Sequence, residues 1–241
     1  MGKFAKWIGG GLGWAFGGPI GGILGFMAGS LFDSLDVNII GKPDGKTTMG
    51  DFAVSLLVLI AAIMKADGKV LKSELDYVKQ FLRQNFGEKE SVEALGMLKE
   101  LLKQNIPVEE VCGQIRRHLD YSSRLQLVHF LFNLANIDGP VTPAEQRLLD
   151  IISVNLGVNI KDEQSIGSMF SKGTLDAAYA VLEVDRNATI PEIKKAYRSM
   201  AVKYHPDKVA YLGEDVKKAA NEKFQKLNEA YELIKKERNF T

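Results

Sequence analysis

The sequence predicts an all-α protein with a membrane-anchoring segment near its N-terminus. Long stretches place apolar residues three and four positions apart, which is the pattern of amphipathic helices. Alternating β-branched residues, which would favour strands, are few, and the 241 residues include only seven prolines. Residues 7–32 carry no charged side chain and are long enough to cross a bilayer as a helix. We expect an anchor, a helical bundle and a C-terminal helical hairpin.

Charge and cysteine content limit the classes of function. The chain has 31 basic and 30 acidic residues and a net charge of +1, so no overall basic excess favours nucleic-acid binding. The single cysteine, Cys112, cannot form an internal disulfide. Its position among apolar helix residues predicts a small buried side chain. Any electrostatic function must therefore depend on a local group of charges.

Residues 1–33 are predicted to form a single-pass membrane anchor that contacts lipid. Glycine recurs at every fourth position and lines one helix face, at Gly9, Gly13, Gly17, Gly21, Gly25 and Gly29. In a bilayer, such a face lets a second helix approach to backbone contact. We therefore expect a homodimer that forms through this glycine-zipper transmembrane helix. Pro19 should kink the helix in mid-span.

Two other interpretations of the same segment stay open. Lys3 and Lys6 before an apolar run also occur in cleaved signal peptides, although this run is longer than the usual apolar region of such peptides. A soluble, flexible glycine-rich leader is disfavoured by the aromatic residues of the run. The charges on either side of the run do not determine its orientation in the membrane.

Residues 51–157 follow a polar linker at 34–50 and are predicted to form a helical domain with an internal repeat. An apolar helix, an Asp-Gly turn and an amphipathic helix that begins with an acid occur twice, at an offset of 71 residues. Two further helices, separated at Pro107, lie between the halves. The sequence therefore predicts a pseudo-symmetric helical bundle.

Four acids repeat at the same offset, namely Asp67, Glu74, Asp138 and Glu145. They could hold a divalent cation, because such cations prefer oxygen ligands. The stronger alternative is structural, since Asp-Gly ends helices and Thr142 to Glu145 reads as a capping box with proline at the first helical position. The paired Asp-Gly turns followed by a glutamate-started helix resemble the TerB-like, tellurite-resistance family, in which metal binding by acids is suggested for some members.

The C-terminal residues 174–241, after a predicted linker at 158–173, read as a short helix followed by a helical hairpin. The second helix carries Lys194, Lys195 and Arg198 opposite its apolar stripe, and no acid neutralises them within 193–204. A charge run of this kind is usually a solvated surface, but it can also bind an acidic partner. The helix stops at His205, Pro206 and Asp207, because proline disfavours helical geometry at the residue before it.

This tripeptide is informative only in its context. It follows YAVLEV, lies within EIKKAYRSMAVKYHPDK and precedes KFQKLNEAYELI, and residues 174–238 thereby resemble the J domain of DnaJ-type proteins. The resemblance implies that His205, Pro206 and Asp207, with the basic side chains of Lys194, Lys195 and Arg198, bind a DnaK-type chaperone and stimulate its ATP hydrolysis. It implies no cofactor and no catalytic group of its own. His118 and His129 lie in apolar helical patterns, which favours packing over catalysis.

The order of anchor, TerB-like domain and terminal J domain resembles that of membrane-tethered co-chaperones. It implies a protein of the bacterial inner membrane whose helical domains face the cytoplasm, where the chaperone and ATP are present. The alternative is an adaptor in which the TerB-like domain senses a metal or stress and the J domain is accessory. Substituting the four repeated acids would separate the two.

Overall fold

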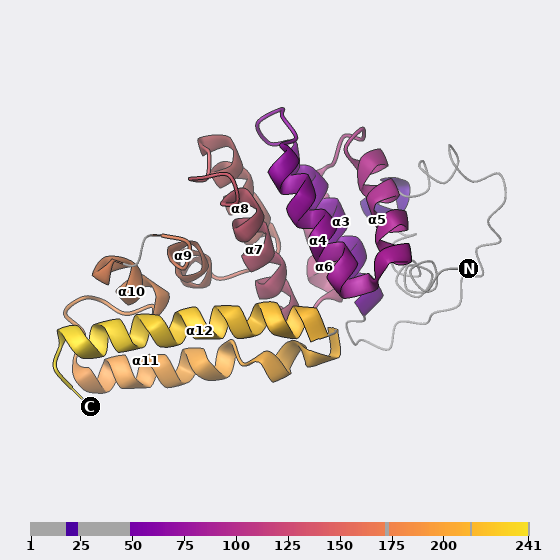
Figure 1. Ribbon diagram of the computed structural model, residues 1–241. Coiled ribbons are helices and arrows are strands. Elements are labelled where there is room, and N and C mark those ends of the chain that lie inside the picture. The colour runs from indigo at the N-terminus through magenta and orange to yellow at the C-terminus, as the bar shows by residue number, and fades with distance from the viewer. Residues whose placement is uncertain (1–17, 24–48, 172–173, 213, 241) are drawn as a thin grey trace, which may run out of the picture.

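The computed structural model of the protein describes residues 18–23, 49–171, 174–212 and 214–240. All regular structure in these ranges is helical, which confirms the predicted all-α fold (Figure 1). The bundle comprises α3 (Met49–Met64), α4 (Lys72–Phe86), α5 (Glu88–Leu101), α6 (Val108–His118), α7 (Tyr121–Ala135), α8 (Pro143–Asn155) and α9 (Ile160–Ser168). The C-terminal domain comprises α10 (Leu175–Val181), α11 (Ile190–Lys203), the 3-10 helix η1 (Pro206–Leu212) and α12 (Glu214–Glu237).

The two most apolar helices, α3 and α7, lie at the centre of the bundle. A helix that is apolar on nearly all sides can be stable in water only when other helices surround it. Accordingly, α3 contacts α5, α6 and α7, and α7 contacts α4, α8 and α9. Cys112 on α6 is fully buried among apolar side chains, as its sequence context predicts.

The internal repeat corresponds to the helix pairs α3–α4 and α7–α8. Each pair is joined through an Asp-Gly turn in which the glycine has a positive φ, 78° at Gly68 and 136° at Gly139. Side chains other than that of glycine are strained in this conformation. The glycines therefore end the first helix of each pair at equivalent places.

The second helix of each pair begins with a cap in which a glutamate binds the backbone. In α8, the Thr142 amide donates to Glu145 Oε2 at 2.8 Å, and the Glu145 amide donates to Thr142 Oγ1 at 3.3 Å. This confirms the predicted capping box. In α4, the Leu71 amide donates to Glu74 Oε2 at 2.9 Å. The leucine side chain has no oxygen that could accept the Glu74 amide, so the second hydrogen bond of a capping box is missing.

Residues 158–173, which we expect from the sequence to be a linker, differ in the structure because they contain α9. Asn159 caps this helix by accepting from the Lys161 amide at 2.9 Å. Ile166 and Met169 are buried, and α9 contacts α7, α8 and α10. The segment therefore joins the bundle to the C-terminal domain as a packed element.

The predicted hairpin is formed by α11 and α12, which lie side by side (Figure 1). The rings of Tyr197 and Tyr231 stack with their centroids 4.1 Å apart. The Tyr197 hydroxyl also donates to Asn228 Oδ1 at 2.8 Å. Figure 1 shows α12 between α11 and the bundle, so one side of α11 faces away from the bundle.

Of the predicted anchor, the structure describes only residues 18–23, which pack on the bundle. Ile20 is fully buried, and its amide donates to Gln114 Oε1 of α6 at 3.1 Å. A Cβ at Gly18 would lie 2.6 Å from the same oxygen, so a larger residue here would displace the Gln114 amide from this contact. Among the described residues, no helix is both long and apolar enough to cross a membrane.

The other residues of the predicted glycine face and nearly all of the linker at 34–50 lie outside the described residues. The members of the glycine face concerned are Gly9, Gly13, Gly17, Gly25 and Gly29. Gly21 is described and is buried.

Candidate functional site

The His-Pro-Asp tripeptide begins the connection between α11 and α12. α11 ends at Lys203, and the Tyr204 amide makes the last helical hydrogen bond, to the Met200 carbonyl at 2.8 Å. Pro206 has no amide hydrogen and disfavours helical geometry at the residue before it. The chain therefore leaves the helix at His205 and continues from Pro206 as η1.

The polar side chains of the tripeptide are exposed. The side chain of His205 is 51% exposed and that of Asp207 is 75% exposed, whereas Pro206 is buried. The Asp207 amide donates to His205 Nδ1 at 3.3 Å, and Oδ2 of Asp207 lies 3.5 Å from the same nitrogen. The His205 ring meets Phe224 of α12 edge to face, with centroids 6.0 Å apart. The tip is thus held by apolar contacts while it presents an imidazole and a carboxylate to solvent.

The three basic side chains of α11 differ in their surroundings. Lys195 and Arg198 are exposed, and the Arg198 Nε donates to the Lys194 carbonyl at 3.2 Å. Lys194 is half-buried, with Nζ 5.3 Å from the centroid of the Phe240 ring. Arg198 lies about two helical turns before His205. A surface with two exposed cations beside this tip is suited to bind an acidic protein surface.

The four repeated acids of the bundle influence one another electrostatically. Burial raises the pKa of Glu74, the hydrogen bond from the Leu71 amide opposes this, and the charges of Glu145, Asp138 and Asp67 raise the pKa further. Both glutamates already bind the backbone at their helix caps. Within the described residues, no group of three or more histidine, cysteine, aspartate or glutamate side chains is arranged to hold a metal ion. The metal hypothesis therefore has no support from this part of the chain.

The remaining histidines lie in packed surroundings. His129 is buried and its ring lies 5.2 Å from that of Phe170, centroid to centroid. His118 is half-buried, with Nδ1 2.9 Å from the Gln114 carbonyl oxygen. Burial lowers the pKa of His129 well below its usual range, and the charges of Lys223 and Lys226 lower it further. His129 is therefore neutral at physiological pH.

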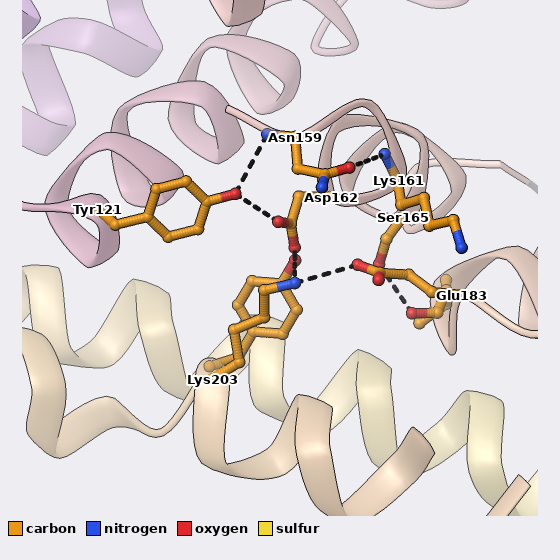
Figure 2. Close-up of polar contacts among 9 residues, drawn as sticks. Tyr121, Asn159, Lys161, Asp162, Ser165, Glu183 and Lys203 are labelled. Atoms are coloured by element: carbon orange, nitrogen blue, oxygen red, sulfur yellow. Dashed lines mark hydrogen bonds and ion pairs between the residues drawn. The ribbon is translucent and has the colours of Figure 1, made fainter. Parts of the chain in front are cut away.

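A polar network next to the tripeptide was not predicted from the sequence (Figure 2). Its centre is the buried carboxylate of Asp162, from α9. Oδ2 accepts from the Tyr121 hydroxyl of α7 at 2.5 Å, and Oδ1 accepts from the Tyr204 hydroxyl at 2.9 Å. Lys203 forms ion pairs with Asp162 and, at 3.3 Å, with Glu183. Asp162 thus joins the bundle to the two residues that directly precede His205.

The network changes the ionisation of its members. Burial alone would raise the pKa of Asp162, but donors from Lys203, Tyr121 and Tyr204 lower it below its ordinary value. Burial raises the pKa of Tyr121 to about 12, and the hydrogen bond to Asp162 adds to this. Asp162 is therefore an ionised acceptor and Tyr121 a neutral donor at physiological pH.

The sequence contains a local pattern that indicates α9, but no pattern that indicates the polar network of Asp162. Asn159 followed by acids at Asp162 and Glu163 is typical of a helix start, and Ile166 fits an apolar face. That pattern could have indicated a helix at 158–173. The partner of Asp162, Tyr204, is 42 residues away, and no local pattern indicates a pairing at that distance.

Three protein-family models match successive parts of the chain. The Co-chaperone DjlA transmembrane domain matches residues 1–49. Tellurite resistance protein TerB matches residues 53–167 and so includes most of α9. The DnaJ domain matches residues 177–239, which contain the His-Pro-Asp tip and both helices of the hairpin.

Two relatives match nearly the whole chain, and one matches its C-terminal part alone. The co-chaperone protein DjlA of Photobacterium profundum is 26% identical over 98% of this chain and 99% of its own length. The DjlA of Coxiella burnetii is 26% identical over 99% of each chain. The chaperone protein DnaJ of Fusobacterium nucleatum subsp. polymorphum is 55% identical over 56 residues, which are 23% of this chain and 14% of that protein. No solved structure matches the chain.

Proposed function

Because the chain is a J-domain protein with a TerB-like domain that resembles the co-chaperone protein DjlA over nearly its whole length, we propose that it is a membrane-tethered co-chaperone of a DnaK-type ATPase. The observation that carries this proposal is the exposed tip of His205 and Asp207, which follows a helix with the exposed cations Lys195 and Arg198. The partner is a nucleotide-dependent chaperone with an acidic docking surface.

In the proposed mechanism, the J domain changes the conformational equilibrium of its partner. The cations of α11 accelerate encounter with an acidic surface by electrostatic steering. The tip of His205, Pro206 and Asp207 then binds the hydrolysis-competent state of the chaperone more tightly than the other state, which shifts the population toward hydrolysis. The chain donates no catalytic group, so its effect depends on differential binding alone.

The membrane tether would localise this activity. The match of residues 1–49 to a transmembrane domain supports an anchor near the N-terminus. A tethered J domain raises the effective concentration of the chaperone near clients at the same membrane. Because the chaperone and ATP are cytoplasmic, the proposal places the TerB-like and J domains on the cytoplasmic side of a bacterial inner membrane.

Single-turnover ATP hydrolysis by a DnaK-type chaperone tests the proposal. The full chain in detergent should accelerate hydrolysis, and His205→Gln should reduce the acceleration to background, because glutamine cannot replace the imidazole contacts of the tip. His118→Gln is a matched control on α6, outside the tripeptide, and should retain the full effect. Equal stimulation by wild type and His205→Gln would contradict the proposed role of the tripeptide.

A further inference from the structure

The bundle contacts the J domain on both sides of the His-Pro-Asp tripeptide. Before it, Lys203 and Tyr204 bind the Asp162 carboxylate. After it, η1 contacts α3 and α7, and the hydroxyl of Tyr211 binds the carboxylate of Asp120 and lies 2.9 Å from the hydroxyl of Ser123. Because the connection from α11 to α12 is bound at both ends, its conformation depends on the bundle.

One of these contacts neutralises a charge that lies next to the tripeptide. Lys203 is the basic residue of α11 nearest to the tripeptide, and its charge is neutralised by Asp162 and Glu183. Pro206 is buried, and the His205 ring accepts from the Asp207 amide within the tripeptide itself. The side chains of His205 and Asp207 remain exposed, so the bundle does not cover the tip but restrains it.

The same interface contains groups that oppose its closure. Lys223 of α12 is fully buried, and its Nζ has no hydrogen-bond partner among the described residues. It lies 3.8 Å from the centroid of the Tyr204 ring, which compensates only part of the lost hydration. The buried Nε2 of His129 on α7 has no partner in the described residues either. Separation of the domains would hydrate groups of this kind, so their burial offsets part of the free energy that the packing of the two domains contributes.

We propose that the packing of the TerB-like bundle on the J domain is an autoinhibitory contact, which restrains the His-Pro-Asp tip and neutralises Lys203 until a DnaK-type chaperone displaces it. The inference rests on the proposed function. A chaperone that binds only the open form competes with Asp162 for Lys203. Its apparent affinity is therefore its intrinsic affinity multiplied by the fraction of the chain that is open. Weakening the contact should therefore activate the co-chaperone.

The experiment compares Asp162→Asn with wild type in the full chain. Asparagine keeps the shape of the side chain and removes the charge that holds Lys203. We expect half-maximal stimulation of single-turnover ATP hydrolysis at a three- to tenfold lower concentration of the variant. Tyr211→Phe removes the contacts on the other side of the tripeptide and should shift the concentration in the same direction. Asp76→Asn, at an exposed position on α4, should leave it unchanged.

Amide hydrogen exchange provides a second readout. In Asp162→Asn, exchange of residues 203–212 should become faster while the bundle core stays protected, which would show opening without unfolding. Unchanged or weaker stimulation by folded Asp162→Asn and Tyr211→Phe, with active wild type, would overturn the inference and leave the proposed function intact. Failure of wild type and both variants to stimulate would overturn the proposed function, and the inference with it.

Discussion

Glu163 of α9 is a buried carboxyl group that makes the folding stability depend on pH. The residue is 8% exposed, and its Oε1 has no hydrogen-bond partner among the described residues. Burial raises its pKa to about 7 from an ordinary value of 4.5, and the charge of Asp150 contributes to the rise. The folded chain therefore holds a proton on Glu163 at pH values where the unfolded chain has released it.

The sign of the effect on stability follows from this difference. Between pH 4.5 and about 7 the folded state binds more protons than the unfolded state, so stability is full below this range and falls as pH rises through it. A tenfold change in proton affinity corresponds to about 1.4 kcal/mol, so the loss is on the order of 3 kcal/mol. Asp162 has a lowered pKa, so its own contribution is instead lost as pH falls below its ordinary range.

Glu163→Gln should remove most of the loss of folding stability between pH 5 and pH 8, because glutamine does not ionise. At pH 8 the variant should melt on the order of 5 °C above wild type. Thermal unfolding followed by circular dichroism at both pH values measures this. Glu93→Gln, at an exposed position on α5, is the control and should leave the dependence unchanged. An identical pH dependence in Glu163→Gln and wild type would show that folding does not raise the pKa of Glu163.

At the scale of elements, the two halves of the repeat differ in one cap. Thr142 and Glu145 bind each other's backbone amides at the start of α8. At the start of α4, Glu74 accepts from the Leu71 amide, but the leucine side chain cannot accept a hydrogen bond in return. A threonine, serine or aspartate side chain at this position accepts a backbone amide that otherwise has no partner in the helix. The side chain of Leu71 is exposed, so its replacement removes no core contact.

Leu71→Thr should therefore stabilise the chain by about 0.5–1 kcal/mol, and the reciprocal Thr142→Leu should destabilise it by about 1 kcal/mol. Urea unfolding at pH 7 compares both with wild type. The glutamates stay in place in each variant, so the difference reports on the side chain at the N-cap position alone. Destabilisation by Leu71→Thr would indicate that the exposed leucine makes a contact worth more than the cap.

The elements that the sequence predicts well are those whose determinants lie close together in the chain. Asp-Gly turns, the capping box at Thr142 and the apolar stripes of α11 and α12 each determine structure within a few residues. The sequence of residues 158–173 mixes polar residues with two glycines and reads as a linker or weak helix, whereas the structure has the packed helix α9 there. Asp162 can be buried as a carboxylate because Tyr121, Tyr204 and Lys203 provide donors from distant parts of the chain.

At the scale of the whole molecule, the tip was predictable but its restraint was not. The His-Pro-Asp tripeptide and the basic residues of α11 form a contiguous pattern that can be identified from residues alone. The contacts of Asp162 and Tyr211 depend on how the bundle and the J domain pack, which no periodicity describes. The proposed partner site is therefore encoded locally, whereas its proposed control depends on tertiary structure.

The proposed membrane anchor would give residues 18–23 a second environment besides the one that the structure shows. In the described structure, Ile20 and Ile23 are buried against the bundle, which a helix in mid-bilayer could not reach. In a membrane, lipid would replace the bundle around these side chains. Gly21 would then belong to the glycine face, whereas Gly22 lies off this face and is exposed.

Self-association in membranes distinguishes these two glycines. Gly21→Leu should reduce the crosslinked dimer severalfold, because a leucine side chain prevents backbone contact between two anchors. Gly22→Leu adds the same apolar volume at a position where a Cβ meets no heavy atom within 4 Å, and should leave the dimer intact. Equal crosslinking of wild type and both variants in native membranes would exclude the glycine face as the interface. A selective loss in Gly21→Leu would show that the spacing of glycines, rather than apolar content alone, determines the assembly of the anchor.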